Sequence, residues 1–260
     1  LLLRCIEHVE ESQIIHIPHV LYHWRMHAES TAMSSDAKPY AMVAGERAIN
    51  EHFARMGVNG SVQLIDYGYK VKYSIPDPVP LVSIIIPTRN AKELVLQCIN
   101  SILKLTTYAS YEVILVDNGS DEEDSLKEWL ILEKSGIKLI RDDSPFNYAA
   151  LNNKAVDLAK GQIIALLNND TEIIEPKWLE IMVGHALRPG IGAVGAKLLY
   201  PNNTIQHAGV VLGMGGHSGA AGHIHYNFPS LSPGYFGRIS LTSNFSAVTA
   251  ACLVVQRRSE

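Results

Sequence analysis

An alternation of short apolar runs and amphipathic segments begins near Leu81 and constrains the fold more than any other feature of the 260-residue chain. Four apolar runs are too short for buried helices and favour strands. They are residues 81–87, 111–116, 137–140 and 162–167. Helical periodicity occupies residues 93–105, 124–134, 149–159 and 176–187. Because strands that alternate with helices of this length form parallel sheets, we expect an α/β fold with helices on both faces.

Beyond residue 187 the pattern weakens. Residues 191–200 and 246–255 favour two further strands, and the second alternates small and apolar side chains as a buried strand does. Residues 213–219 are rich in glycine and have no periodicity. A surface loop is the favoured interpretation of that stretch, and a lid beside a ligand site is the alternative.

The chain before residue 80 has a different character. The pattern predicts two short strands around a turn at Pro18, then a helix that ends at Gly57, then a hairpin. These elements are residues 14–17, 20–25, 38–56, 62–66 and 69–73. Pro76, Pro78 and Pro80 make a stiff connector. We therefore divide the chain into residues 1–36, 37–79 and 80–260, so that a small α+β segment precedes the α/β domain.

Composition limits the partners. A formal net charge of -4 and a pI near 6.3 argue against a nucleic-acid partner, because binding to phosphate backbones requires a basic surface. Cys5, Cys98 and Cys252 lie far apart and suggest reduced thiols in a cytoplasmic protein. The sequence has no apolar run long enough to span a membrane, so membrane attachment is expected to be peripheral at most, at the inner membrane.

Polar side chains follow three of the predicted strands at the point where each strand ends. The motifs are Pro87-Thr88-Arg89-Asn90, Asp117-Asn118-Gly119-Ser120 and Asn168-Asn169-Asp170. The carboxyl ends of parallel strands share one edge of a sheet, which is where such sheets bind ligands. The alternatives are an ordinary turn formed by Asp117 and Asn118 before Gly119, and a cap on the next segment formed by Asn168, Asn169 and Asp170.

The turn after the first predicted strand excludes two large classes of function. Neither a dinucleotide fingerprint nor a phosphate-binding P-loop is present, because both need glycines where this chain has Pro-Thr-Arg-Asn. The chain would therefore hold phosphate by other means. A divalent cation on Asp170 is the available one.

These motifs, together with Phe146-Asn147-Tyr148-Ala149-Ala150-Leu151-Asn152-Asn153, resemble the family 2 inverting glycosyltransferases. The resemblance covers roughly residue 81 to the C-terminus. It implies a GT-A type fold, with a Rossmann-like and mostly parallel sheet. It also implies a nucleotide-diphosphate sugar as donor, a glycan or lipid-linked acceptor, and Mn²⁺ or Mg²⁺ as cofactor.

The resemblance also assigns roles to residues. Thr88 and Asn90 would line the base and ribose pocket, and Asp117 would hydrogen-bond the nucleobase. Asn152 stands where many members have a base-contacting Arg. Asp170 would be the main metal ligand, because the first Asp of the Asp-X-Asp motif is replaced by Asn168. Asn168 would bind ribose, or the metal through a water. His207 would face the donor sugar or acceptor, with a purely structural role as the equal alternative.

The resemblance implies direct displacement at the anomeric carbon, with a carboxylate deprotonating the acceptor hydroxyl. That base is expected beyond Glu260, so the catalytic residue is unknown and this segment alone is expected to be inactive. Residues 1–7 and 22–30 resemble the family's segment that follows the base, in which a His, here His27, can ligate the metal.

The simplest interpretation is a chain that spans the tail of one glycosyltransferase module and the head of the next. In the alternative, the tail docks on the head within one chain or is exchanged between two copies as a homodimer, which returns His27 to the metal. His23 and His27 have a spacing that suits zinc on a helix, but Tyr-His-Trp-Arg favours a strand, so no zinc pair is expected.

The function that follows is transfer of a hexosyl or deoxyhexosyl group in the synthesis of a bacterial surface polysaccharide or lipopolysaccharide. The alternative is a non-catalytic module that binds nucleotide or carbohydrate and serves as a scaffold.

Overall fold

The computed structural model describes residues 1–23, 39–214 and 219–257. The chain forms two compact units. The first unit comprises Leu1–Ser74 and Pro233–Thr242, and the second comprises Ile75–Ser232 and Ser243–Glu260.

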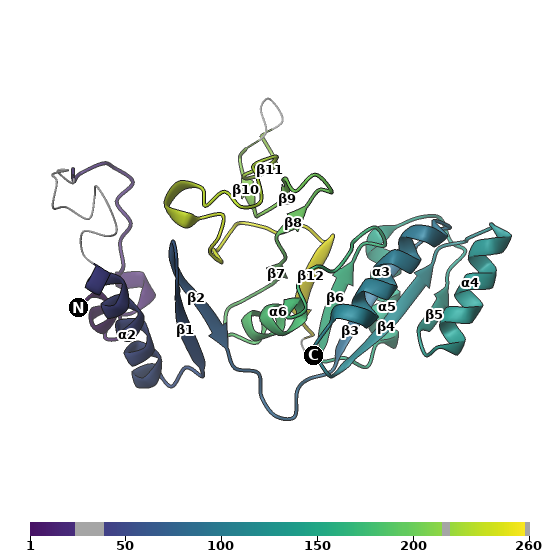
Figure 1. Ribbon diagram of the computed structural model, residues 1–260, viewed down its shortest axis with the longest axis horizontal. Coiled ribbons are helices and arrows are strands. Elements are labelled where there is room, and N and C mark those ends of the chain that lie inside the picture. The colour runs from purple at the N-terminus through teal and green to yellow at the C-terminus, as the bar shows by residue number, and fades with distance from the viewer. Residues whose placement is uncertain (24–38, 215–218, 258–260) are drawn as a thin grey trace. The chain divides into compact units, whose positions relative to one another are not determined.

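The second unit is built on a six-stranded sheet with the order β5-β4-β3-β6-β12-β7 (Figure 1). Its strands are β3 (Val82–Thr88), β4 (Tyr111–Asp117), β5 (Lys138–Arg141), β6 (Ile163–Leu167), β7 (Val194–Gly195) and β12 (Cys252–Gln256). The strands β3, β4, β5 and β6 are parallel, and β12 pairs antiparallel with β6 and with β7. The expected α/β fold with a mostly parallel sheet is confirmed.

Helices cover both faces of this sheet, because successive side chains of a strand point to opposite faces. They are α3 (Lys92–Leu105), α4 (Glu123–Lys134), α5 (Tyr148–Leu158) and α6 (Trp178–Ala186). Ile84 and Ile86 belong to the core cluster that includes residues of α3, α4 and α6, whereas Ile85 packs in the cluster formed with α5. Each of these isoleucines is fully buried, and such burial stabilises by roughly 1.5–3 kcal/mol per side chain.

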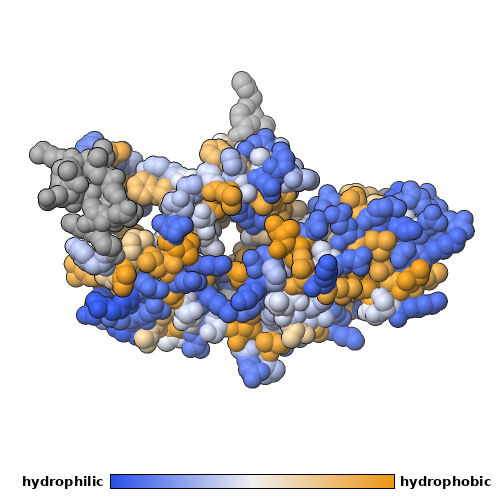
Figure 2. All heavy atoms as spheres, viewed as in Figure 1, coloured by the Kyte–Doolittle hydropathy of each residue, from blue (hydrophilic) through white to orange (hydrophobic). Residues whose placement is uncertain are grey.

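Local chemistry sets the ends of these helices. Asn147 caps α5, since its side-chain oxygen accepts a hydrogen bond from the Ala150 N–H at 3.0 Å. Helix α4 has Glu123 and Asp124 in its first turn and Lys134 in its last, which suits the helix dipole. Hydrophilic side chains cover much of the end of the unit that α3, α4 and β5 form (Figure 2).

Gly161 allows the chain to pass close to β3 just before β6 begins. A Cβ at this position would lie 2.6 Å from the backbone nitrogen of Ser83, so only glycine fits without a shift. The Gly161 N–H donates to the Ser83 hydroxyl at 2.8 Å, and that hydroxyl donates to Glu112 at 2.6 Å. This close approach holds the start of β6 against the start of β3.

Two predicted strands differ from the structure. The strand expected over residues 191–200 is two short strands, because the chain leaves the main sheet after β7 and forms β8 (Leu198–Leu199) with β9 (Ile205–His207). The strand expected over residues 246–255 is regular only in β12. The chain before β12 runs irregularly instead, with a single bridge between Ala247 and Val210 of β10 (Val210–Leu212). Strand β10 pairs with β11 (Ala221–His223).

The first unit contains α1 (Leu2–Ile6), the short 3-10 helices η1 (Glu11–Gln13) and η4 (Tyr235–Gly237), α2 (Pro39–Met56) and the hairpin of β1 (Gly60–Ile65) and β2 (Gly68–Tyr73). The predicted helix and hairpin are confirmed. Glu7 accepts hydrogen bonds from Arg55 at 2.8 and 2.7 Å and lies 2.7 Å from the His52 ring, which ties α1 to α2. Arg55 and His52 lower the pKa of Glu7 to about 2.

The strand-turn-strand expected around Pro18 is wrong where the structure describes it. Residues 14–23 form no strand, and their apolar side chains are exposed. The β-like pattern there finds no partner strand within the described residues, and a lone strand leaves its backbone groups unpaired. Within the described residues, no helix has the length and apolar character needed to cross a membrane.

Candidate functional site

The carboxyl edge of the parallel strands brings together the three predicted strand ends. Thr88 of β3 is in register with Asp117 of β4, and Asp117 is in register with Arg141 of β5. Asn168 follows the last residue of β6, the strand on the other side of β3. Residues far apart in the sequence therefore form one row at this edge.

Asp117 is buried at this edge, with 1% of its surface exposed. One carboxylate oxygen accepts from the Ser120 N–H at 3.0 Å and from the Ser120 hydroxyl. The other oxygen accepts from Arg141 Nη1 at 2.5 Å. The contact with Ser120 is typical of an ordinary turn, which was the alternative for this motif. The ion pair with Arg141 gives the carboxylate a second partner. The predicted nucleobase ligand is thus bonded within the protein already.

Ser120 joins the ends of β3 and β4. Its hydroxyl donates to Asp117 and accepts from the Asn90 N–H at 2.7 Å and from Trp129 Nε1 at 3.3 Å. Trp129 lies on α4, so the packing of that helix is coupled to the position of the Asp117 carboxylate. Ser120 itself is buried, with 1% of its surface exposed.

Asn90 lies in a left-handed turn, with φ of 53°. Its side-chain oxygen accepts from the N–H groups of Asp121 and Glu122 at 3.0 and 3.2 Å, and its amide donates to Asp121 at 2.8 Å. These bonds give hydrogen-bond partners to the backbone N–H groups just before α4. The same bond from Asn90 lowers the pKa of Asp121. The predicted ribose contact is therefore bonded to the loop after β4.

The end of β6 is linked to the end of β3 by a side-chain bond. Asn169 donates to the Thr88 hydroxyl at 2.9 Å, and Thr88 donates to the Asn90 carbonyl at 3.2 Å. Asn168 is half-buried and Asp170 is exposed. No helix follows directly, since α6 begins at Trp178, so the cap predicted as the alternative for Asn168 is not formed.

Asp170 is the exposed carboxylate that follows β6 at this edge. Among the described residues, no three His, Cys, Asp or Glu side chains gather closely enough to hold a metal. One carboxylate with a neighbouring amide fits Mg²⁺ or Mn²⁺, which take few protein ligands and complete their shells with water and substrate phosphate. His27, the second predicted ligand, lies outside the described residues.

Asn152 lies buried on α5. It is 5% exposed, and its amide donates to the Tyr148 carbonyl one helical turn earlier at 2.8 Å. Its side-chain oxygen is buried with no hydrogen-bond partner among the described residues. Tyr148 donates to the Ala250 carbonyl at 3.4 Å, and burial raises its pKa.

His207 is also buried, with 1% exposure. One ring nitrogen lies 3.0 Å from the His223 ring, and the other accepts from the Thr249 N–H at 3.5 Å. Burial, and then His223, lower the pKa of His207 to about 4. Both ring nitrogens of His207 therefore have protein partners.

The chain that precedes β12 also borders this edge. The Ala251 carbonyl accepts from the Asn168 N–H at 3.0 Å and from Thr171 at 3.5 Å. Because Tyr148 also donates to the Ala250 carbonyl and the Thr249 N–H donates to His207, this stretch joins α5, β6 and β9.

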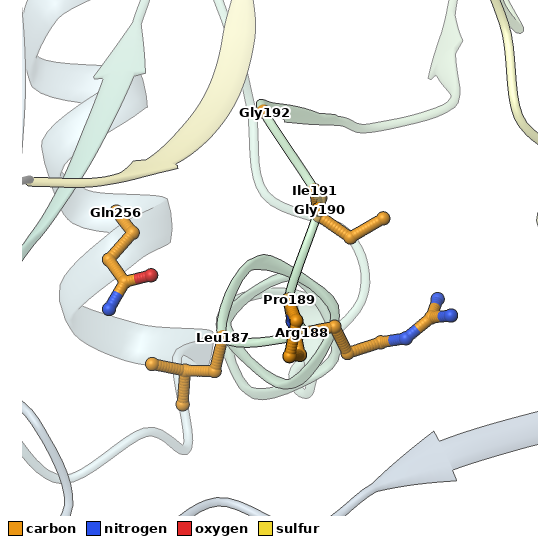
Figure 3. Close-up of a pocket in the computed structure, with 7 residues that line it drawn as sticks. All are labelled: Leu187, Arg188, Pro189, Gly190, Ile191, Gly192 and Gln256. Atoms are coloured by element: carbon orange, nitrogen blue, oxygen red, sulfur yellow. The ribbon is translucent and has the colours of Figure 1, made fainter.

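A separate open depression of about 720 Å³ lies between the end of α6 and Gln256 (Figure 3). Gln256 pairs with Ile163 at the start of β6. The depression is therefore at the opposite edge of the sheet from Thr88, Asp117 and Asp170. It is lined by Leu187, Arg188, Pro189, Gly190, Ile191, Gly192 and Gln256.

Sequence reasoning assigned no role to Arg141, Ser120 or Asn169. Arg141 is the last residue of the third parallel strand, and this position was a signal that could have included it. Ser120 and Asn169 lie inside the strand-end motifs. Their contacts depend on distances across strands, which spacing in the sequence does not report.

The chain is similar to known proteins along almost all of its length. The chain is 50% identical over 262 residues to the uncharacterized protein y4gI of Sinorhizobium fredii, which covers 99% of this chain and 28% of that protein. It is 39% identical over 253 residues to the O-antigen biosynthesis protein RfbC of Myxococcus xanthus, which covers 95% of this chain and 19% of that protein.

Among solved structures, the mannosyltransferase PcManGT from Pyrobaculum calidifontis, in complex with GDP-Man and Mn²⁺, matches with a TM-score of 0.43 and 20% identity, over 65% of this chain and 47% of that one. The model of the family named Glycosyl transferase family 2 matches residues 83–256, which run from the second residue of β3 to the end of β12 and include Thr88, Asp117, Arg141 and Asp170. The chain therefore belongs to glycosyl transferase family 2.

Proposed function

We propose that the carboxyl edge of β3, β4 and β6 binds a nucleotide-diphosphate sugar and a divalent cation for glycosyl transfer. The observation that supports this most is the row formed by Thr88, Asp117 and Arg141, with exposed Asp170 after the next strand. All lie within the residues that match the family. The similarity to an O-antigen biosynthesis protein favours a role in the synthesis of a bacterial surface polysaccharide.

In this proposal the two sides of the edge hold different parts of the donor. Asp117, Thr88 and Asn90 surround the base and ribose, and Asn168 contacts ribose or a metal-bound water. The hydrogen bonds of Asp117 and Asn90 within the protein exist before the donor binds, so the donor contacts side chains whose positions are already fixed. Rigid contacts of this kind reduce the entropy lost on binding.

Asp170 would hold Mn²⁺ or Mg²⁺ together with the diphosphate of the donor. When bound, the cation would neutralise the charge that develops on the leaving diphosphate. With one carboxylate and one amide, the protein alone would bind the cation weakly. Metal and nucleotide should therefore bind cooperatively.

The proposed reaction is a single displacement with inversion. The acceptor hydroxyl oxygen bonds to the anomeric carbon, the bond from that carbon to the diphosphate oxygen breaks, and the hydroxyl proton passes to a carboxylate base. The acceptor would be a glycan or a lipid-linked glycan. We assign no described residue as the base.

We further propose that residues 1–36 are the tail of one glycosyltransferase module and residues 80–260 the nucleotide-binding part of a second. The resemblance of residues 1–7 and 22–30 to the family's segment that follows the base supports this, and the matched region covers only 28% and 19% of the two longer relatives. His27 would then serve a different site from Asp170. An H27A variant should keep the manganese-dependent nucleotide affinity of the chain, and a loss as large as that of D170N would favour tail docking instead.

Calorimetric titration of the chain with UDP, GDP and dTDP, with and without Mn²⁺, tests the proposal. We expect at least one nucleotide to bind, and to bind more tightly with Mn²⁺. Absence of binding to all three in the presence of Mn²⁺ would refute it. Because the Asn168-Asn169-Asp170 motif has a single carboxylate, the scaffold alternative remains the second candidate, and nucleotide binding that is indifferent to metal would favour it.

A further inference from the structure

The guanidinium of Arg141 is held by three acceptors of the carboxyl edge. Its Nε donates to Asp143 at 2.6 Å, and its Nη1 donates to Asp117 at 2.5 Å and to the Ser120 carbonyl at 2.9 Å. A guanidinium has five N–H donors in a rigid plane. Three donors are thus used to fix the plane of the group against the ends of β4 and β5.

The two N–H donors of Nη2 have no hydrogen-bond partner among the described residues. The Arg141 side chain is 41% exposed, whereas Asp117 behind it is 1% exposed. A ligand that approaches this part of the edge therefore meets the guanidinium before it meets the carboxylate. The arrangement presents a fixed pair of donors to the ligand.

The charges around Arg141 disfavour phosphate as its partner. Asp117 and Asp143 bond to it directly, and its charge contributes to the lowered pKa of Asp121. Arg89 pairs with Asp121 at 3.7 Å, so three carboxylates and two guanidinium groups gather here, and their net negative charge disfavours a diphosphate more than a neutral ring. A carbonyl oxygen of a neutral ligand can still accept from Nη2.

We propose that Arg141 is a specificity-determining residue that reads a carbonyl edge of the donor nucleobase. This inference rests on the proposed function, and it assigns to Arg141 the direct base contact that the sequence motif assigned to Asp117. Asp117 becomes the group that positions the guanidinium. Uracil, thymine and guanine present carbonyl acceptors to such a pair of donors, whereas adenine presents none.

The competing explanation is that Arg141 only neutralises buried Asp117. Three variants separate the two. R141M removes the donors and the charge, R141K keeps the charge without the planar fork, and the D117N/R141M double variant removes both charges, so that no carboxylate is left buried without a partner. R47M is the control, because Arg47 is an exposed arginine in a salt bridge with Glu51 in the other unit.

The experiment measures binding of UDP, GDP, ADP and inorganic pyrophosphate to the chain in the presence of Mn²⁺. We expect the wild type to prefer UDP or GDP over ADP. R141M and D117N/R141M should bind the preferred nucleotide about tenfold more weakly, as expected for loss of a charged hydrogen bond, and should lose the preference over ADP. R141K should show an intermediate loss, and R47M should show none.

Pyrophosphate provides the distinguishing measurement. Its affinity should stay within about twofold in every Arg141 variant, since it has no base. Equal losses for pyrophosphate and nucleotide, or an unchanged base preference in D117N/R141M, would overturn the role of Arg141 while leaving nucleotide binding intact. A wild type that binds no nucleotide would instead refute the proposed function itself.

Discussion

The two halves of the carboxyl edge differ in how far their polar groups are bonded within the protein. On the side of β4 and β5, Asp117, Ser120 and Arg141 are joined by hydrogen bonds and an ion pair. On the side of β6, Asp170 is exposed and Asn168 is half-buried. The side of β4 and β5, the preformed half, therefore has its polar groups fixed before a ligand binds. The side of β6, the sparse half, gains its partners from the ligand.

The largest expected effect concerns the preformed half. R141M leaves the Asp117 carboxylate buried with Ser120 as its remaining partner, so we expect a loss of about 2 kcal/mol in the free energy of unfolding, reduced from the cost of a fully buried pair because Arg141 is partly exposed. Urea denaturation measures this loss. D170N on the other half should change stability by less than about 0.5 kcal/mol, and an equal loss in both variants would break the comparison.

The next effect concerns His207, which packs beside the chain that borders the sparse half. Its pKa of about 4 in the folded state lies below the ordinary value of 6.5. Protons therefore bind the unfolded state more readily, and stability is lost as the pH falls from about 6.5 towards 4.

H207Q should reduce this loss. Urea denaturation between pH 7 and pH 4 measures the slope, with H8Q as a control because His8 is exposed in the other unit. If wild type and H207Q lose stability in parallel, His207 is not the group that titrates.

A smaller effect is expected for ligand binding at the sparse half. D170N should weaken the manganese-dependent affinity for the preferred nucleotide about tenfold and leave the affinity without metal nearly unchanged. Calorimetry with and without Mn²⁺ measures both. D157N is the matched control, since Asp157 is an exposed aspartate on α5. A loss that is the same without metal would contradict the assigned role of Asp170.

The smallest effect is a gain. N168D restores a second carboxylate beside Asp170, so manganese should bind roughly threefold more tightly in the presence of nucleotide. N153D adds the same charge at an exposed position on α5 and should have no effect. If N168D weakens metal binding, Asn168 does not lie where a second ligand would be useful.

Most of the second unit could be predicted from its sequence, because its strands are apolar runs and its helices have clear periodicity. The breaks at 196–197 and before Cys252 could not. Ala196 and the residues before Cys252 are apolar enough for a strand. Their irregular paths accompany bonds from Ala196 to Cys252, from Asn168 to Ala251 and from Thr249 to His207. Residues 14–22 are the converse case, since their β-like pattern has no partner strand among the described residues.

The sequence by itself determined the strand ends. Thr88, Asp117, Asn168 and Asp170 follow apolar runs that form parallel strands, and parallel strands place their carboxyl ends on one edge. Only the tertiary structure decided which of these groups is free. It bonded Asp117 to Arg141, buried Asn152 and His207, and left Asp170 exposed, because cross-strand register and helix packing set distances that no linear spacing encodes.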